Sequence, residues 1–332
     1  MMNKRQRVEA VLAGRRPDHP PVSFWYHFPP DQATGQAAID AHLALLDKYD
    51  LDFLKVMNDH EYPRSEVEVI HTAADLSKIK TLPGDTGELG EQLKVVRAIT
   101  ARLGKDVLTC TTIFNPWTVL RKLVAPLNRV HMPPRMDGTD ERDEVLSRLL
   151  KEDRSAVQAA VLAIAGTLTN FARLCIEAEA SGIFLSVRDD WVDRKENGEH
   201  TYEEIVRPAD RQILAAVQNA SFNVLHICGR ALHFEAFADY PVHVINWADR
   251  SAGPSIAYAR DRVKPAIAGG VDNLKTLREG IPADCAAEVR DALHQAKDRP
   301  IMITPGCTFD PQAVPPENLR AIVDAARNIA SE

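Results

Sequence analysis

The stretch from Val224 to Gly229 reads VLHICG, and it ends a short apolar run with a histidine and a cysteine two positions apart. In a β-strand, residues i and i+2 point to the same side, so His226 and Cys228 are expected to face one point in space. A further cysteine, Cys307, follows much later in the stretch PGC. One imidazole and two thiolates are a familiar zinc-binding set, and three protein ligands with an open fourth position are typical of a catalytic zinc site. The alternative is that both cysteines are ordinary buried apolar residues.

VLHICG belongs to one of eight short apolar runs that alternate with longer helical patterns. The runs predict strands at residues 21–27, 53–58, 107–113, 182–187, 222–227, 243–247, 266–270 and 301–305. The helical patterns lie at residues 36–49, 89–103, 156–180, 202–219, 231–238, 255–262, 282–296 and 316–329. Strict alternation implies parallel strands joined by crossovers, and eight such units predict a closed (β/α)8 TIM barrel. An open doubly wound sheet is the alternative, but no Gly-x-Gly-x-x-Gly follows the first run, which argues against a nucleotide-binding Rossmann fold.

Composition and charge limit the classes of partner. The 332 residues carry 40 Lys and Arg against 47 Asp and Glu, a net charge of −7 without a basic block, so nucleic acid is not an expected partner. No apolar run approaches the ~18–20 residues of a membrane span, and the basic start lacks the apolar core of a signal peptide. We interpret that start as an N-terminal surface helix ended by Gly14 and Pro17. Five irregularly spaced cysteines fit a reducing, cytoplasmic environment. Without a linker-like stretch, residues 1–332 are predicted to form a single domain.

Two long segments interrupt the alternation, at residues 59–80 and 115–140. Both follow the carboxyl ends of predicted strands, so in a barrel they are expected to lie over the catalytic face. Long connections in a compact domain are usually functional or mobile. The second segment contains Pro133, Pro134 and Gly138 and is the better candidate for a lid, and the alternative is a solvated surface excursion.

Polar residues gather where the predicted strands end, and in a barrel this end builds the active site. We predict catalytic roles for Asp189, Asn246 and Asp249. We predict contacts with cofactor or substrate for His27, His60, Asn115, Trp247 and Asp272. For Asp189 and its neighbour Asp190, capping or pairing with Arg188 is an alternative role. The other cysteines, Cys110, Cys175 and Cys285, are predicted to be buried apolar residues.

Several stretches of the chain resemble the uroporphyrinogen decarboxylase superfamily. They are RVEAVLAG at 7–14, RPDHPPV at 16–22, FNPWT at 114–118, NWAD at 246–249, AGGVD at 268–272, TPGC at 304–307 and PPENL at 315–319. The resemblance covers essentially the whole chain and implies a barrel of this family. It is strongest from about residue 222 onward.

Two branches of this superfamily differ at the residues that matter here. The decarboxylases bind a porphyrinogen with many carboxylates, partly through an arginine-rich stretch after the first strand. This chain has YHFPPDQ at 26–32 and no arginine between Arg16 and Arg64, whereas a polyanion needs cationic partners. The zinc-dependent corrinoid methyltransferases, such as methylcobamide:coenzyme M methyltransferases, carry His-x-Cys and a distant Cys. Here the corresponding residues are His226, Cys228 and Cys307, and the resemblance implies that they hold Zn²⁺.

The resemblance to this branch implies a specific reaction. A thiol at the open metal position is deprotonated and attacks the methyl group of a methylcobamide, a cobalamin-type corrinoid. A separate corrinoid protein is expected to carry it, because the chain shows no corrinoid-binding motif. The acceptor is coenzyme M, another thiol or a folate. Without substrate, the fourth ligand is expected to be Glu61, Asp249, Asp272 or Asp310, and family members often form homodimers.

Two other functions stay open at this point. The first is a metal-free decarboxylase of the porphyrinogen type, in which Asp189 or Asp190 holds pyrrole N–H groups. The second is a barrel in which zinc is structural, for which a fourth strong protein ligand is required.

Overall fold

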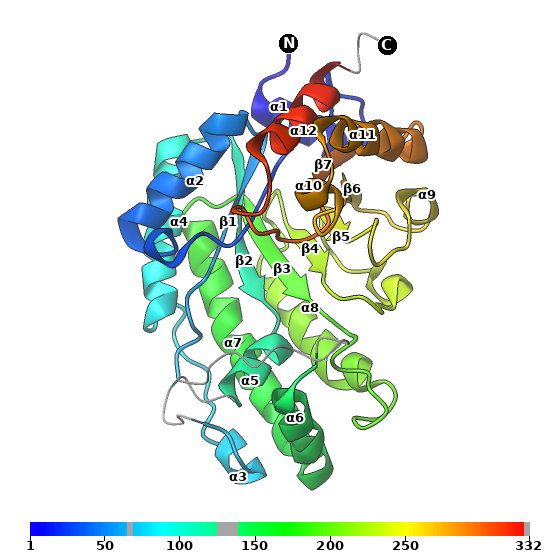
Figure 1. The fold of residues 1–332 in the computed structure, drawn as a ribbon. Helices are drawn as coiled ribbons and strands as arrows, with labels where there is room; N and C mark the ends of the chain where they lie inside the picture. The colour runs from blue at the N-terminus through cyan, green and yellow to red at the C-terminus, as the bar shows by residue number, and fades with distance from the viewer. Residues whose placement is uncertain (65–68, 125–138, 329–332) are drawn as a thin grey trace.

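The structure is a computed structural model that describes residues 1–64, 69–124 and 139–328. Seven parallel strands form one sheet in chain order, each paired with the next (Figure 1). They are β1 (Phe53–Val56), β2 (Leu108–Phe114), β3 (Gly182–Val187), β4 (Val224–Ile227), β5 (Val244–Trp247), β6 (Ala266–Val271) and β7 (Ile301–Pro305). The predicted α/β architecture with a parallel sheet is confirmed, and all carboxyl ends of the strands meet at one edge.

The prediction of a first strand at residues 21–27 is wrong, because this segment forms only a single β-bridge. Val22 pairs in parallel with Ile303 of β7. Its carbonyl accepts a hydrogen bond from the Asp52 backbone N–H at 2.9 Å, next to β1. This segment therefore lies between the two edge strands, where an eighth strand would be. Two consecutive prolines, Pro20 and Pro21, have no N–H to donate, so they add no donor to the ladder before Val22.

Helices connect consecutive strands, and the longest ones surround the sheet (Figure 1). They are α1 (Lys4–Leu12), α2 (Gly35–Tyr49), α4 (Glu88–Leu103), α7 (Arg154–Glu177), α8 (Arg207–Ala216), α11 (Pro282–Ala296) and α12 (Pro316–Asn328). Shorter helices are α3 (Ala73–Leu76), α9 (Ile256–Ala259) and α10 (Thr276–Glu279). The helix predicted at 231–238 is only a 3-10 turn, η3 (Phe234–Phe237), and the one predicted at 202–219 begins as a π-helical turn, η2 (Tyr202–Val206).

The long segment predicted at residues 115–140 is partly helical. Its first part forms α5 (Pro116–Leu123), and α6 (Glu141–Glu152) follows the segment. Asn115 caps α5 by accepting a hydrogen bond from the Thr118 N–H at 3.1 Å, and Pro116 occupies the first turn, where proline is favoured. The remainder of the predicted lid, residues 125–138, lies outside the described residues.

Within the described ranges, α7 alone is long and apolar enough to cross a membrane by length and composition. Many of its apolar side chains, including those of Val161, Ile164 and Phe171, are buried inside the fold, whereas Leu162 is exposed. The core helix of a globular protein passes the same compositional test, so α7 is accounted for as the helix that backs strand β3.

An ion-pair cluster links the N-terminal helix to the point of barrel closure. Arg7 of α1 donates to Asp52 at 2.5 Å and to Asp18 at 2.7 Å. The other oxygen of Asp52 accepts from the backbone N–H of Val22 at 2.8 Å. The hydrogen bond from Arg7 lowers the pKa of Asp18 to about 2. The cluster therefore holds the bridging segment against β1.

Candidate metal centre

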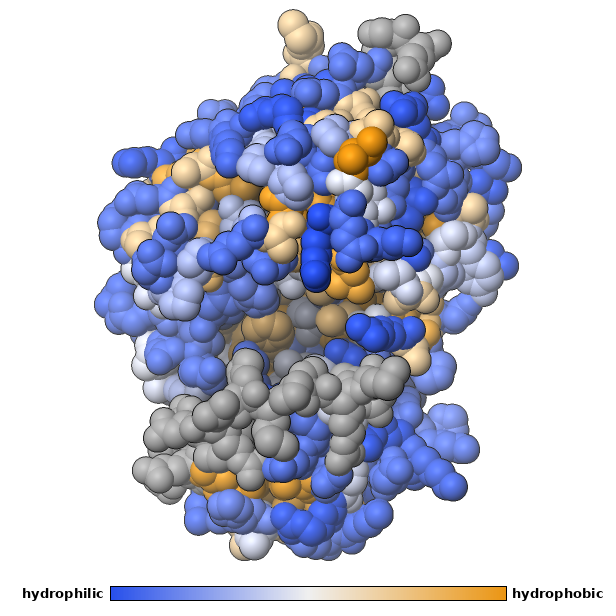
Figure 2. All heavy atoms as spheres, in the orientation of Figure 1, coloured by the Kyte–Doolittle hydropathy of each residue, from blue (hydrophilic) through white to orange (hydrophobic). Residues whose placement is uncertain are grey.

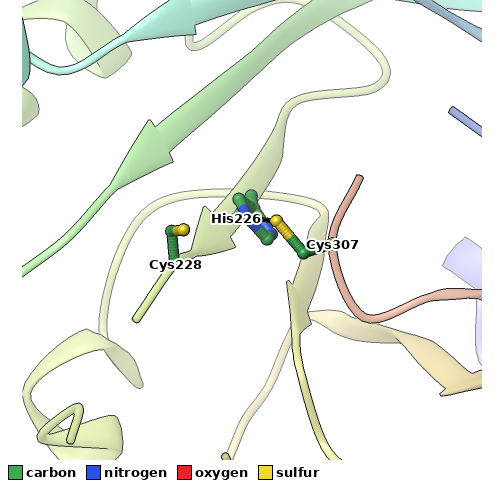
Figure 3. Close-up of side chains that lie close together, drawn as sticks. All are labelled: His226, Cys228 and Cys307. Carbon is green, nitrogen blue, oxygen red and sulfur yellow. Dashed lines mark hydrogen bonds between the residues drawn. The ribbon is translucent and has the colours of Figure 1, made fainter. Parts of the chain in front are cut away.

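His226, Cys228 and Cys307 come together at the carboxyl ends of β4 and β7 (Figure 3). Their ligand atoms all lie within 4.8 Å of one another. The Cys307 Sγ is 3.4 Å from the His226 Nε2. His226 and Cys228 are two positions apart, and Cys307 follows 79 positions after Cys228. The three side chains lie close together, as expected from the sequence.

The ring of His226 is oriented by Asn246, the neighbouring residue in β5. The Asn246 Oδ1 lies 2.6 Å from the His226 Nδ1. The Asn246 Nδ2 donates to the carbonyls of Ala268 at 2.9 Å and Pro305 at 3.1 Å, which fixes the amide so that its oxygen faces the ring. Nδ1 therefore carries the proton, and the Nε2 lone pair points toward Cys307. This is the arrangement of a metal-binding histidine, whose other ring nitrogen is usually hydrogen-bonded.

The two thiols of the cluster differ from the other three cysteines. Cys110, Cys175 and Cys285 are buried, as predicted, and burial raises the pKa of Cys110 to about 12. Cys228 and Cys307 are partly exposed. The interaction between the two thiols raises the pKa of Cys228 and lowers that of Cys307, and His226 lowers the latter further. A thiol pair of this kind deprotonates readily when a soft cation binds.

The donor set fits zinc, which prefers imidazole nitrogen and thiolate sulfur. In the part of the chain that the structure describes, the cluster includes no carboxylate. None of the predicted fourth ligands, Glu61, Asp249, Asp272 or Asp310, joins it. Among the described residues, the cluster thus offers three His and Cys donors and no fourth His, Cys, Asp or Glu.

Asp249 and Asp272 stabilise the loops after β5 and β6. The Asp249 Oδ1 accepts from the Gly270 N–H at 2.9 Å, and burial raises the pKa of this carboxyl to about 6. A Cβ at Gly269 would lie 2.8 Å from the same oxygen, so a glycine is needed there. Asp272 accepts from the backbone N–H of Leu274 at 2.8 Å. Their predicted catalytic and binding roles remain predictions.

Asp189 and Asp190, at the end of β3, hold the loop that carries Cys228. The buried Asp189 accepts from the backbone N–H of His233 at 2.9 Å and lies 2.7 Å from its ring Nδ1. Burial raises the pKa of Asp189, and its Oδ1 has no hydrogen-bond partner among the described residues. Asp190 pairs with Arg188 and accepts from the Arg230 N–H at 3.0 Å. Pairing with Arg188, the alternative considered from the sequence, is thus found for Asp190.

Two histidines lie where β1 and the first bridge end. His27 is half exposed and pairs with Asp59. The His60 Nδ1 lies 3.6 Å from Glu88, and its Nε2 is buried with no hydrogen-bond partner in the described ranges. Their predicted contacts with cofactor or substrate remain predictions.

Asn115 and Trp247 have clear structural partners instead. Both side chains are fully buried. Asn115 caps α5, and the Trp247 indole N–H donates to the Pro254 carbonyl at 2.8 Å. Their predicted binding roles remain predictions.

The sequence reasoning missed Lys55, a lysine buried in β1. Its Nζ lies 4.1 Å from the centroid of the Phe184 ring, and this ring stacks on His226. The available signal was a single lysine inside the apolar run FLKVM at 53–57. A charged residue in the interior of a predicted barrel strand is costly to bury and therefore marks a site.

The face shown in Figure 2 is hollowed near its centre, in front of the central strands seen in Figure 1. Apolar residues are visible within the hollow (Figure 2). Because the active sites of such folds lie at the carboxyl ends of the strands, this hollow is the expected approach to the metal centre.

A family model for uroporphyrinogen decarboxylase (URO-D) matches residues 51–329. The chain belongs to this family. It is 25% identical over 257 residues to the methylcobamide:CoM methyltransferase MtbA of Methanosarcina mazei, covering 76% of this chain and 68% of that protein. A solved structure of a methyltransferase from Methanosarcina mazei superposes with a TM-score of 0.71 at 16% identity, covering 99% of this chain and all of that one. The family predicted from the sequence is confirmed, and these relatives agree with the methyltransferase branch.

Proposed function

We propose that the protein is a zinc-dependent methyltransferase that moves a methyl group between a methylcobamide and a thiol. The observation that carries this proposal is the cluster of His226, Cys228 and Cys307, with ligand atoms within 4.8 Å and no fourth ligand among the described residues. The similarity to a methylcobamide:CoM methyltransferase supports the same reaction.

The residues of the site have separable tasks. His226 Nε2 and the sulfurs of Cys228 and Cys307 would hold the zinc ion. Asn246 keeps the His226 ring in the tautomer that leaves Nε2 free. Asp189, through His233, holds the loop that bears Cys228. A zinc ion with an open position favours the deprotonated form of a thiol that binds there.

The remaining polar residues at this end of the sheet are proposed to contact the substrates. His27, His60 and Asp272 are candidates for contacts with the corrinoid or the acceptor. A separate corrinoid protein is the proposed partner, and the hollow on this face is where it would present the methyl group. All five cysteines are free, which is consistent with a cytoplasmic location. A homodimer remains a prediction.

Methyl transfer from free methylcobalamin tests this function directly. The zinc-loaded protein is mixed with methylcobalamin and, in separate reactions, with coenzyme M, 2-mercaptoethanol or tetrahydrofolate. We expect thiol-dependent loss of the methylcobalamin absorption spectrum, absent in Cys307→Ala and retained in the matched control Cys285→Ala, since Cys285 lies in α11 outside the cluster. No demethylation with any acceptor, or full activity in Cys307→Ala, would contradict the proposal.

A further inference from the structure

Lys55 lies inside the barrel, one aromatic ring away from the metal centre. The residue is 4% exposed. Its Nζ is 4.1 Å from the ring centroid of Phe184 and 5.5 Å from that of Trp25. Phe184 stacks on His226 with 5.4 Å between ring centroids and 27° between planes. β2 lies between β1 and β3, so the Lys55 side chain reaches past β2 to the Phe184 ring on the same face of the sheet.

A buried ammonium group needs compensation, since removing a charge from water is costly. No hydrogen bond or ion pair of Lys55 is found among the described residues, and the faces of Phe184 and Trp25 compensate only in part. The pKa of Lys55 is lowered to about 8, mainly by burial. Interactions with Cys307, Cys110, Asp59 and Cys228 act in the opposite direction and raise it. The ammonium form thus still predominates at pH 7.

Of these four groups, Cys110 remains a neutral thiol, because burial raises its pKa to about 12. Asp59 contacts His27 through one oxygen, and its other oxygen is buried with no hydrogen-bond partner among the described residues, so this carboxylate offsets part of the Lys55 charge. The other contributions come from the thiols of the metal centre, Cys307 and Cys228, and that of Cys307 is the largest of the four.

The charge of the loaded site explains why a cation would be kept there. Zinc, two thiolates and a neutral imidazole sum to zero, so an added thiolate leaves one net negative charge in a buried place. We propose that Lys55 is the counter-charge that favours an anionic fourth ligand over a neutral one at this site, an inference that rests on the function proposed above. The charge of Lys55 acts on the metal site through space, so Lys55 is a positioning residue rather than a catalytic one.

The test compares two equilibria in Lys55→Met, Lys55→Arg and the control Lys122→Met. Lys122, in α5, also lies over an aromatic ring, 4.4 Å from the centroid of Phe114, but outside the cysteine cluster. Zinc affinity is measured by competition with a chromophoric chelator. The affinity of the zinc-loaded protein for 2-mercaptoethanol, whose tail is uncharged, is measured by calorimetry together with proton release.

Loss of the ammonium is expected to change one of the two equilibria. In Lys55→Met, thiol affinity is expected to fall on the order of tenfold with less proton release at pH 7. Zinc affinity is expected to stay close to that of the wild type, because two thiol protons leave as the dication binds and the net charge of the site does not change. Lys55→Arg and Lys122→Met are expected to behave as the wild type. Thiol affinity in Lys55→Met within twofold of wild type, or a parallel loss of zinc and thiol binding, overturns the inference. A wild-type protein that binds zinc but no thiol overturns the proposed function and this inference together.

Discussion

Asn246 shows how a single residue determines the chemistry available to His226. The sequence pointed to Asn246 because it follows an apolar run, and the predicted role was catalytic. In the structure it is fully buried and bonded to the Nδ1 of His226. The residue type was therefore identified from the sequence but not its task, since the pairing of β4 with β5 that brings the two residues together is a non-local contact.

Replacing Asn246 by alanine is expected to weaken zinc binding by about 10- to 100-fold, the usual effect of removing a hydrogen-bond partner of a metal ligand. The physical reason is that the His226 ring loses both its orientation and its tautomer preference. Competition with a chelator measures the change. An Asn246→Ala protein that folds and binds zinc as tightly as the wild type would show that His226 needs no such support.

At the scale of elements, the buried cluster of Arg7 and Asp52 fixes the N-terminal helix where the barrel closes. Arg7→Met leaves Asp52 buried without its cation and is expected to cost about 3–5 kcal/mol of unfolding free energy. The matched control is Arg5→Met on the same helix, whose partly exposed pair with Glu9 is expected to contribute about 0–1 kcal/mol. Urea denaturation of both variants measures the difference, and equal losses would refute the role given to Arg7.

A second buried group, in α8, makes stability depend on pH. Asp210 is fully buried and accepts from the Tyr202 hydroxyl at 2.5 Å and from the Tyr240 hydroxyl at 3.3 Å. Burial raises its pKa to about 7, whereas the unfolded value is about 3.9. The folded state therefore holds the extra proton between these values, and the unfolding free energy falls as pH rises from about 4 to about 7.

Asp210→Asn removes this titration but retains an oxygen for the two tyrosines. The unfolding free energy of the variant minus that of the wild type is expected to be roughly 2 kcal/mol higher at pH 8 than at pH 5. Urea unfolding at the two pH values is the measurement. The same stability difference at both values would mean that Asp210 does not carry the proton.

Other features of the elements were beyond sequence reasoning. Helix α5 was predicted as part of the long segment at residues 115–140, although Asn115 and Pro116 together form a helix start. Residues 21–27 were predicted as a strand from their apolar side chains, but only Val22 forms a bridge, to Ile303. In both cases backbone hydrogen bonding prevailed over side-chain pattern.

At the scale of the whole molecule, the alternation of strands and helices was sufficient to predict a parallel sheet with one active edge. Because the strand ends share that edge, the sequence alone was sufficient to group His226, Cys228 and Cys307. Lys55 could not be grouped with them, because its side chain reaches past β2 to Phe184, a contact that depends on side-chain packing rather than on strand order. The strand and helix pattern of the sequence thus predicts which residues lie at the carboxyl ends of the strands. Side-chain packing determines which buried groups, such as Lys55, lie close to them.

X-ray absorption at the zinc edge, on protein with and without 2-mercaptoethanol, tests the central claim most directly. The account predicts stoichiometric zinc with two sulfur neighbours and a histidine nitrogen, and a third sulfur at about 2.3 Å when the thiol is added. A zinc ion with four protein ligands whose sulfur count does not change on adding thiol, or a protein that binds no zinc, would contradict it.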